Sequence, residues 1–425
     1  MRKKLLIALA ALLLLLLAGA AAAYFVLKPD RPEGHLDTEL EGVSLFQDTG
    51  ATSEEPEETT TAEQPAPAPD GPPPERCWNN FGGNQRRTLA LPDVQLGIPS
   101  KRDWRRYMHD VMEYPPTFCD GIIYANLEHG RTVAVRASNG RRLWERRHEG
   151  ATASSPAIDG PRLIVSSHAG TVTGLRRSNG KVLWRLRVPG KVESSPVVVD
   201  GTAYFGTTEG RLFAVRSKTG RVRWAYDTGG RMNASPSVFG DRVCNSTYAG
   251  SIICVRKSSG REIWTTYVSR DALRMESFYA SPSTDGRRLF TVARTGKVVA
   301  LSAQSGRILW TYNMGALAYS TPAIANGMIY VSAFDGGIRA LRASNGSVKW
   351  TRFVPGRILG PALVVGDLVF VSTLEKRTYG LRRSSGRIVW QLDRGKYAPG
   401  IATNRRYYFS LNGSLISYRG RSGPK

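Results

Sequence analysis

Three glutamates, Glu113, Glu193 and Glu276, are the carboxylates best placed for acid or base chemistry, because each comes shortly before an expected inner strand. The chain after residue 75 is poor in such groups, with 22 acidic against 54 basic residues. No Ser, His and Asp follow one another in an order typical of hydrolases, and there is no phosphate-binding loop or His-x-His pair. His129 and His168, in equivalent turns, form only a weak candidate metal pair. We therefore expect neither a catalytic residue nor a metal site.

The four cysteines are even in number, which is typical of disulfides in an exported domain. Cys244 and Cys254 lie symmetrically about an expected hairpin turn at Ala249, which places them opposite one another on two strands. We predict that these two are bonded, and by elimination that Cys77 is bonded to Cys119.

The elements that position these residues follow from a repeat of 40 residues. A Gly stands four residues before seven of the eight repeated tryptophans, and a Pro follows twelve residues after most of them. One interval is 46 residues instead of 40. The repeated tryptophans are Trp104, Trp144, Trp184, Trp224, Trp264, Trp310, Trp350 and Trp390.

Each period contains four short strands separated by turns. Residues 196–199, 202–207, 211–216 and 221–226 are short apolar or alternating runs, and Asp200-Gly201 is a strong hairpin signal between the first two. Repeated four-stranded antiparallel units of this length, each with one Trp, are typical of β-propeller blades. The fold class is therefore predicted to be all-β.

Eight blades are predicted, because the sequence after Trp390 supplies three further strands but no ninth Trp. The missing outer strand is the one around Trp104, so both ends of the propeller would share one sheet and close the ring. The alternative is a seven-bladed ring in which the first or last unit is left frayed.

The segment Ala300–Trp310, which reads ALSAQSGRILW, resembles the pyrroloquinoline quinone (PQQ) repeat Ala-x-Asp-x-x-Thr-Gly-Lys-x-x-Trp. The leader Trp78–Thr88 resembles the opening Trp-x-x-Phe-x-Gly-(Asp/Asn) that precedes propellers of this family. The resemblance covers about residues 76–420. The PQQ-like family includes quinoprotein dehydrogenases and the non-catalytic BamB proteins, so the resemblance implies an architecture and leaves the activity open.

The chain departs from the dehydrogenase pattern, which implies adjacent cysteines, a calcium site and an Asp base. No two cysteines are adjacent, and the position eight before Trp, usually Asp in the family, is mostly Arg. In a propeller all these positions emerge on one face, so we expect either a solvated basic surface or a docking rim for polyanions. The expected rim consists of Arg136, Arg176, Arg216, Arg256, Arg342 and Arg382, with Ser302 in the remaining blade.

The longest loop between blades, 265–281, is expected on the opposite face and is a candidate partner site. It mixes charged and aromatic side chains, with Arg270, Arg274, Glu276, Phe278 and Tyr279 as the candidate contacts. Tyr114, Tyr279, Tyr319 and Tyr397 are expected near the central funnel, either as packing residues or as stacking partners for a planar ligand.

The N-terminus carries Arg2, Lys3 and Lys4, followed by 23 apolar residues from Leu5 to Leu27, enough to cross a bilayer. We expect residues 1–28 to be a cytoplasmic basic tip and one uncleaved transmembrane helix, with a long signal peptide as the alternative. Residues 29–75 are acidic and rich in Pro and Thr, which predicts a disordered stalk; docking of this strip on the basic domain is the other possibility. The propeller is expected over 76–420 and a flexible tail over 421–425.

We expect a membrane-anchored, extracytoplasmic scaffold that is monomeric, holds no cofactor and binds a protein or an anionic envelope polymer. Nucleic acid is possible as a partner but no motif supports it. The alternative is a PQQ-dependent oxidoreductase, in which PQQ and calcium would occupy the funnel.

Overall fold

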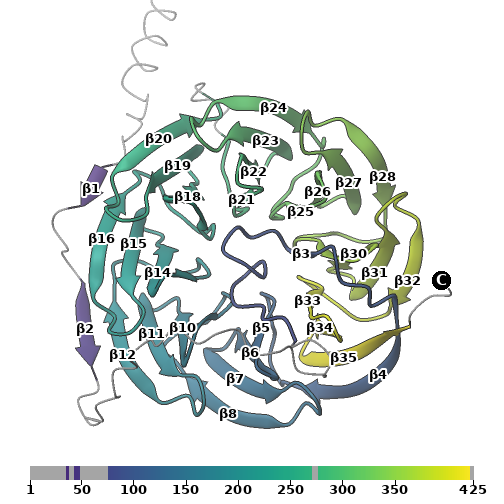
Figure 1. Cartoon of the computed structure of the whole chain (residues 1–425), viewed down its shortest axis with the longest axis horizontal. Coiled ribbons are helices and arrows are strands. Elements are labelled where there is room, and N and C mark those ends of the chain that lie inside the picture. Colours follow the sequence, from purple (N-terminus) through teal and green to yellow (C-terminus); the bar gives the residue numbers. More distant parts are fainter. Residues whose placement is uncertain (1–34, 38–42, 48–74, 270–275, 422–425) are drawn as a thin grey trace, which may run out of the picture.

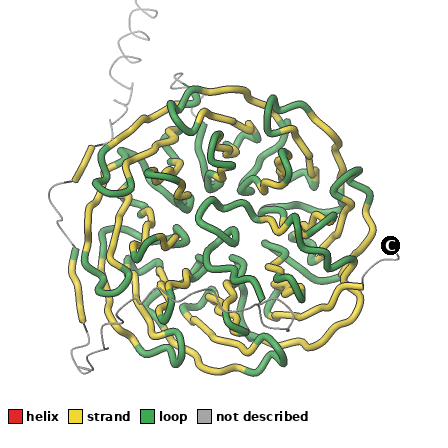
Figure 2. The backbone as a smooth tube through the Cα atoms, in the orientation of Figure 1, coloured by secondary structure: helices red, strands yellow, loops and turns green. Residues whose placement is uncertain are grey.

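The computed structural model describes residues 35–37, 43–47, 75–269 and 276–421. Their strands form eight sheets arranged around a central axis, as Figure 1 shows. The assigned elements of these residues are all strands, joined by the turns and loops visible in Figure 2. The prediction of an all-β, eight-bladed propeller with four-stranded antiparallel blades is confirmed, and the seven-bladed alternative is wrong.

The first four blades each run from an inner strand at the axis to an outer strand at the periphery. Blade 1 holds β5 (Thr117–Cys119), β6 (Ile122–Leu127), β7 (Arg131–Arg136) and β8 (Arg142–Arg147). Blade 2 holds β9 (Ala157–Asp159), β10 (Arg162–Ser166), β11 (Thr171–Arg176) and β12 (Val182–Arg187). Blade 3 holds β13 (Val197–Val199), β14 (Thr202–Gly206), β15 (Arg211–Arg216) and β16 (Val222–Asp227). Blade 4 holds β17 (Ser237–Phe239), β18 (Arg242–Ser246), β19 (Ser251–Arg256) and β20 (Glu262–Tyr267).

The other four blades repeat the same order. Blade 5 holds β21 (Ser283–Thr284), β22 (Arg288–Val292), β23 (Lys297–Ser302) and β24 (Ile308–Asn313). Blade 6 holds β25 (Ala323–Ala325), β26 (Met328–Ser332), β27 (Gly337–Arg342) and β28 (Val348–Phe353). Blade 7 holds β29 (Leu363–Val365), β30 (Leu368–Thr373), β31 (Arg377–Arg382) and β32 (Ile388–Leu392). Blade 8 holds β33 (Gly400–Ala402), β34 (Tyr407–Leu411), β35 (Ser414–Arg421) and β4 (Ile98–Tyr107).

Blade 8 closes the ring in the predicted way, because its outer strand β4 comes from the N-terminal side of the propeller. β4 pairs antiparallel with β35, and Trp104 lies opposite Ser417. This pairing removes an open edge from both strands. β35 extends to Arg421, one residue into the segment that we expected to be a flexible tail.

The repeated tryptophans link each blade to the next. Seven of them donate an indole N–H to a carbonyl of the following blade, for example Trp184 Nε1 to Ser217 O at 2.8 Å. The repeated glycine lies under the preceding blade's ring: a Cβ on Gly220 would come within 2.6 Å of Trp184. Gly220 also has φ +72, so both the space available and the backbone conformation favour Gly at this position. Trp390 packs instead on Phe409, with ring centroids 5.1 Å apart.

The predicted cysteine pairing is confirmed. Cys244 and Cys254 are register partners on β18 and β19 and form one disulfide. Cys77 is bonded to Cys119, which ties the leader to the inner strand of blade 1.

Two N-terminal segments add a fifth strand to a blade. β1 (His35–Asp37) pairs with β16, and β2 (Ser44–Gln47) pairs with β12. The expectation of disorder throughout 29–75 is therefore wrong for these residues. They dock on the propeller instead, as the alternative prediction had it. Val43 packs against the core between blades 2 and 3, which gives this part of the acidic segment an apolar anchor.

The predicted transmembrane helix at residues 1–28 lies outside the described residues, as does most of the stalk. Within the part of the chain that the structure covers, no helix is long and apolar enough to cross a membrane.

Candidate binding site at the centre of the ring

The leader, residues 76–91, runs across the axis of the propeller, inside the ring of blades (Figure 1). It pairs with blade 1 through Trp78 and Phe118, and short β3 (Ala90–Leu91) pairs in parallel with β29 of blade 7. Between these ends it accepts one hydrogen bond from the inner strand of each blade it passes. The inner-strand N–H donors are Ile158, Val198, Val238, Thr284, Ile324 and Val364.

Arg87 holds the leader at the axis. Its side chain is fully buried and donates to the carbonyls of Phe81 (2.8 Å), Ser195 (2.9 Å) and Pro236 (2.6 Å). Burial lowers the pKa of its guanidinium to about 9. The backbone of Arg87 has φ 56 and that of Leu89 φ 52, conformations that L residues adopt only when their surroundings compel them.

One face of the ring, here called the funnel face, carries the loops that enter each inner strand. The residue before the repeated Pro forms a serine ladder on this face: the Ser155 amide donates to the Ser195 hydroxyl, and the same bond recurs from blade to blade. The ladder runs through Ser155, Ser195, Ser235, Ser281 and Thr321, over distances of 2.8–3.1 Å. Its equivalents in blades 7, 8 and 1 are Pro361, Ala398 and Pro115, which supply neither the hydroxyl nor, at the prolines, the amide.

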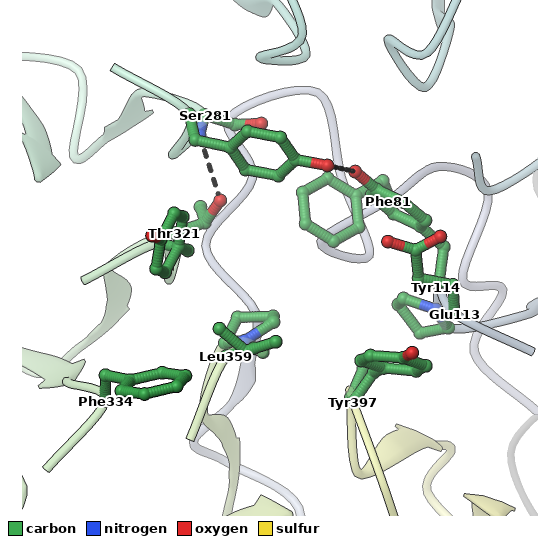
Figure 3. A pocket seen from close by; sticks show the side chains of 14 residues that line it. Phe81, Glu113, Tyr114, Ser281, Thr321, Phe334, Leu359 and Tyr397 are labelled. Atoms are coloured by element: carbon green, nitrogen blue, oxygen red, sulfur yellow. Dashed lines mark hydrogen bonds between the residues drawn. The ribbon is translucent and has the colours of Figure 1, made fainter. Parts of the chain in front are cut away.

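A pocket of about 410 Å³ spans the interruption of the ladder. Pro361, Ala398 and Pro115 line it together with the last two ladder residues, Ser281 and Thr321, and Phe81 of the leader contributes from the centre. Figure 3 shows aromatic rings from several blades facing one space. The rings in the lining are Phe81, Tyr114, Tyr279, Tyr319, Phe334 and Tyr397.

These rings meet at steep angles. Phe81 and Tyr114 are inclined by 73°, and Tyr279 and Tyr319 by 79°. The hydroxyls of Tyr114 and Tyr279 lie 3.5 Å apart (Figure 3). Burial raises the pKa of Tyr279 to about 12 and that of Tyr114 well above its usual value, so both phenols stay neutral at physiological pH. The predicted funnel tyrosines therefore do converge.

Glu113 is the single charged residue of the lining. Its pKa is raised, first by burial and then by the carboxylates of Glu128 and Glu193, while Lys396 lowers it. Among the residues that the structure describes, its carboxylate makes no hydrogen bond or ion pair.

The other two candidate carboxylates lie elsewhere. Glu193 pairs with Arg231 at 3.6 Å and accepts a hydrogen bond from Asn233. Glu276 is buried, 2.6 Å from the Lys297 ammonium. The structure therefore leaves Glu113 alone in the pocket and gives the others pairing roles.

Part of the candidate partner loop, residues 265–281, is buried. Arg270 and Arg274 lie outside the described residues. Phe278 is fully buried in the core between blades 4 and 5, so its assignment as a partner contact is wrong. Its apolar character reflects core packing, and Tyr279 next to it lines the pocket.

The Arg rim lies on the face opposite the funnel and is partly neutralised. Arg256 pairs with Asp241 at 3.3 Å, Arg382 pairs with Asp367, and Arg342 bonds Ser347. Arg136, Arg176 and Arg216 are exposed and, within the described chain, have no side-chain partner.

Phe81 and the serine ladder were not predicted as site residues. The ladder is visible in the sequence as Ser or Thr before the repeated Pro, and its breaks are visible as Pro115, Pro361 and Ala398. Phe81 reaches the pocket only because the leader crosses the axis of the ring, which no periodicity of the blades indicates.

The residues of the pocket do not fit PQQ or calcium. PQQ carries three carboxylates and needs cationic partners, whereas the lining contains no Lys or Arg and one carboxylate. Calcium takes six to eight oxygen ligands, usually several from carboxylates. In the described chain the one cluster with metal-ligand spacing is Cys77, Cys119 and Asp120, and its two thiols are joined in a disulfide. His129 pairs instead with Asp110 at 2.7 Å.

Comparison with known proteins agrees with this fold. The sequence matches the family described as outer membrane protein assembly factor BamB over residues 100–272 and 250–396. Among curated protein sequences, none matches significantly.

Solved structures with the same fold have low sequence identity. BamB from Moraxella catarrhalis is 16% identical with a TM-score of 0.65, over 76% of this chain and 99% of that one. The quinohemoprotein alcohol dehydrogenase ADHIIG from Pseudomonas putida HK5 is 13% identical with a TM-score of 0.68, over 82% and 81% of the two chains. On the family match, this chain belongs to the BamB family of PQQ-like repeat β-propellers.

Proposed function

We propose that this protein is a non-catalytic, membrane-anchored scaffold that binds a protein partner on the funnel face of its propeller. The observation that carries the proposal is the composition of the pocket, which offers aromatic surface in place of groups that would hold PQQ and calcium. Similarity in fold to a dehydrogenase does not supply those groups.

Exposed apolar side chains support a protein partner. Leu317 is 49% exposed in the loop that also carries Tyr319, and its carbonyl accepts the amide of Phe334 from the pocket lining. Phe353, at the end of β28, is 56% exposed. Leu317, in the loop that enters β25, and Phe353, at the end of an outer strand, both lie on the funnel face. Exposed apolar side chains on the same face as an aromatic pocket suit a protein interface.

The anchor and compartment are part of the proposal. The apolar run Leu5–Leu27 behind three basic residues supports an uncleaved span with the propeller outside the cytoplasm. The two disulfides support an oxidising compartment.

An anionic polymer is a second candidate partner, favoured by one observation. Arg136, Arg176 and Arg216 stand on three consecutive blades, and their guanidinium groups have no partner among the described residues. Binding through them would weaken steeply as salt rises, whereas binding at the apolar side of the funnel face would not.

The test places a photocrosslinking residue at Leu317 or Phe353 of the full chain in its native membrane. We expect a discrete protein adduct from both positions. Phe46, which is 61% exposed on β2 of blade 2, is the matched control and should give none. Equal adducts from all three positions, or none from Leu317 and Phe353, would contradict the proposal.

A calorimetric titration of the same protein with PQQ and calcium addresses the oxidoreductase alternative. We expect no saturable heat at high micromolar cofactor. One site per chain would restore the alternative.

A further inference from the structure

We infer that the pocket of the funnel face is a receptor for the side chain of a lysine or arginine of the partner, with Glu113 as its counter-charge and the aromatic rings as its walls. The inference rests on the proposed function, because it names the group by which a protein partner is recognised.

The first step is that Glu113, which is partly buried, lacks a cation, whereas the buried acids Asp110 and Glu276 of the same face each have one. Five other carboxylates on the funnel face pair with basic side chains, at 2.6–3.6 Å: Asp110 with Arg131, Glu193 with Arg231, Glu276 with Lys297, Asp335 with Arg339, and Glu375 with Arg357. Glu113 has no such partner among the described residues, although basic residues outnumber acidic ones by more than two to one after residue 75. A partly buried carboxylate without a partner gains most from a cation supplied from outside.

The second step is the arrangement of the rings. Tyr114, Tyr279, Tyr319 and Tyr397 come from four different loops, and Phe81 comes from the leader, so rings surround the space from several directions (Figure 3). Aromatic faces attract ammonium and guanidinium groups, and a box of rings strengthens this by excluding water. The Tyr397 ring already contacts a cation, because the Lys396 ammonium lies 4.7 Å from the ring centroid. Lys396 itself is not part of the pocket lining.

The third step is the balance of charge around the pocket. Glu128 and Glu193 act on Glu113 as like charges, and Lys396 opposes them. Arg87 lies 5.3 Å from the centroid of the Phe81 ring and also opposes a cation, but its guanidinium is already bonded to three carbonyls. The carboxylate that faces the space is therefore nearest to the incoming group.

The fourth step favours a side chain over a free ion. Leu359 and the prolines of the lining suit the methylene stem of Lys or Arg, which buries well against apolar surface. The exposed Leu317 and Phe353 lie outside the pocket and require a larger partner to cover them.

The binding test uses the full chain in nanodiscs, titrated with n-butylammonium, n-butylguanidinium and neutral 1-butanol. We expect both cations to bind about tenfold or more tightly than butanol, and Glu113→Gln to remove that preference. Glu193→Gln is the matched control, since it removes a carboxylate of the same face that lies outside the lining, and we expect at most about a threefold loss. Equal binding of butanol, or no binding of the cations to the wild type, would overturn the inference.

A second variant keeps the test independent of charge and of any folding defect in Glu113→Gln. Leu359→Trp should fill the pocket and abolish cation binding while the circular dichroism spectrum stays that of the wild type. Cation binding that survives Leu359→Trp would place the site elsewhere and overturn the inference.

The crosslinking assay separates a partner's side chain from a small cation. If the partner inserts Lys or Arg, the adduct at Leu317 falls about tenfold or more in Glu113→Gln and Leu359→Trp. Small-cation binding with an unchanged adduct would overturn the inference and leave the scaffold proposal intact. Absence of any adduct in the wild type would instead contradict the proposed function, whatever the cations do.

Discussion

The two sides of the ring differ at one repeat position, the residue before the repeated Pro. In blades 2 to 6 the residue before the repeated Pro is Ser or Thr, and the backbone amide of each in blades 2 to 5 donates to the hydroxyl of the next blade. In blades 7, 8 and 1 it is Pro or Ala, and the pocket spans this gap and ends at the last two ladder residues, Ser281 and Thr321. Because buried polar groups need partners, the first side is fixed by its own backbone, whereas the second is free to vary its side chains.

The leader is what joins the two sides. Arg87 bonds carbonyls of blades 3 and 4 on the laddered side, while Phe81, six residues earlier, lines the pocket. Because one strained segment, the leader, contributes to the pocket from the centre of the ring, the pocket can be lost without unfolding the blades. We therefore expect that some substitutions lower the free energy of unfolding and that others weaken binding alone.

The largest effect is expected for Arg87→Met. The substitution leaves three buried carbonyls without a donor and removes the group that holds the leader at φ 56, so we expect unfolding to require about 3 kcal/mol less free energy. Urea denaturation of the full chain, followed by Trp fluorescence, measures it.

Arg87→Lys sharpens that experiment, because Lys keeps the charge but cannot bond three carbonyls in one plane. We expect it to be nearly as unstable as Arg87→Met. A Lys variant as stable as the wild type would show that charge, and not the fork of hydrogen bonds, holds the leader.

A smaller effect should distinguish the two sides directly. Ser235→Ala removes the hydroxyl that accepts the Ser195 amide at 2.9 Å, so a buried N–H is orphaned and about 1–2 kcal/mol of stability is lost. Ala398→Ser makes the reverse change on the pocket side. Its hydroxyl meets Pro361, which has no N–H, so we expect a change within about 0.5 kcal/mol.

The paired denaturation curves decide the point. A stabilising Ala398→Ser, or a neutral Ser235→Ala, would show that the ladder does not distinguish the sides of the ring.

The fold was accessible from the sequence because its signals repeat. Trp and Gly recur at fixed spacing since each Trp packs on the next blade's Gly, and Trp104 marked the closing strand by standing before the first complete blade. The tyrosines of the pocket were predicted for the same reason, as they precede inner strands. The prediction for Phe278 was wrong because an aromatic residue in a long loop is expected to be exposed, whereas this side chain is buried in the core.

What a period cannot show is a segment that does not repeat. The leader and strands β1 and β2 contact several blades through backbone hydrogen bonds, which depend on where the chain passes and not on side-chain type. Arg87 illustrates this, since a basic residue in a basic domain gave no indication that it is fully buried.

The smallest expected effect is the pH dependence that Glu113 gives to the free energy of unfolding. Its folded-state pKa is raised by burial and by Glu128 and Glu193, against Lys396, while Tyr114 and Tyr279 stay neutral in this range. A raised pKa means that the protonated group favours the fold: the contribution is complete below the unfolded pKa near 4.5 and is lost as pH rises through the folded value.

We therefore expect Glu113→Gln and the wild type to have similar stabilities below about pH 4.5 and the variant to gain above it. The gain is at most about 1.4 kcal/mol for every tenfold difference in proton affinity between the folded and unfolded carboxylate. Glu193→Gln should shrink this pH-dependent loss without abolishing it, since Glu128 and burial remain. Parallel stability profiles for the wild type and Glu113→Gln would show that the carboxylate is as well solvated in the fold as in the unfolded chain. The pocket side would then lack the uncompensated charge that sets it apart from the laddered side.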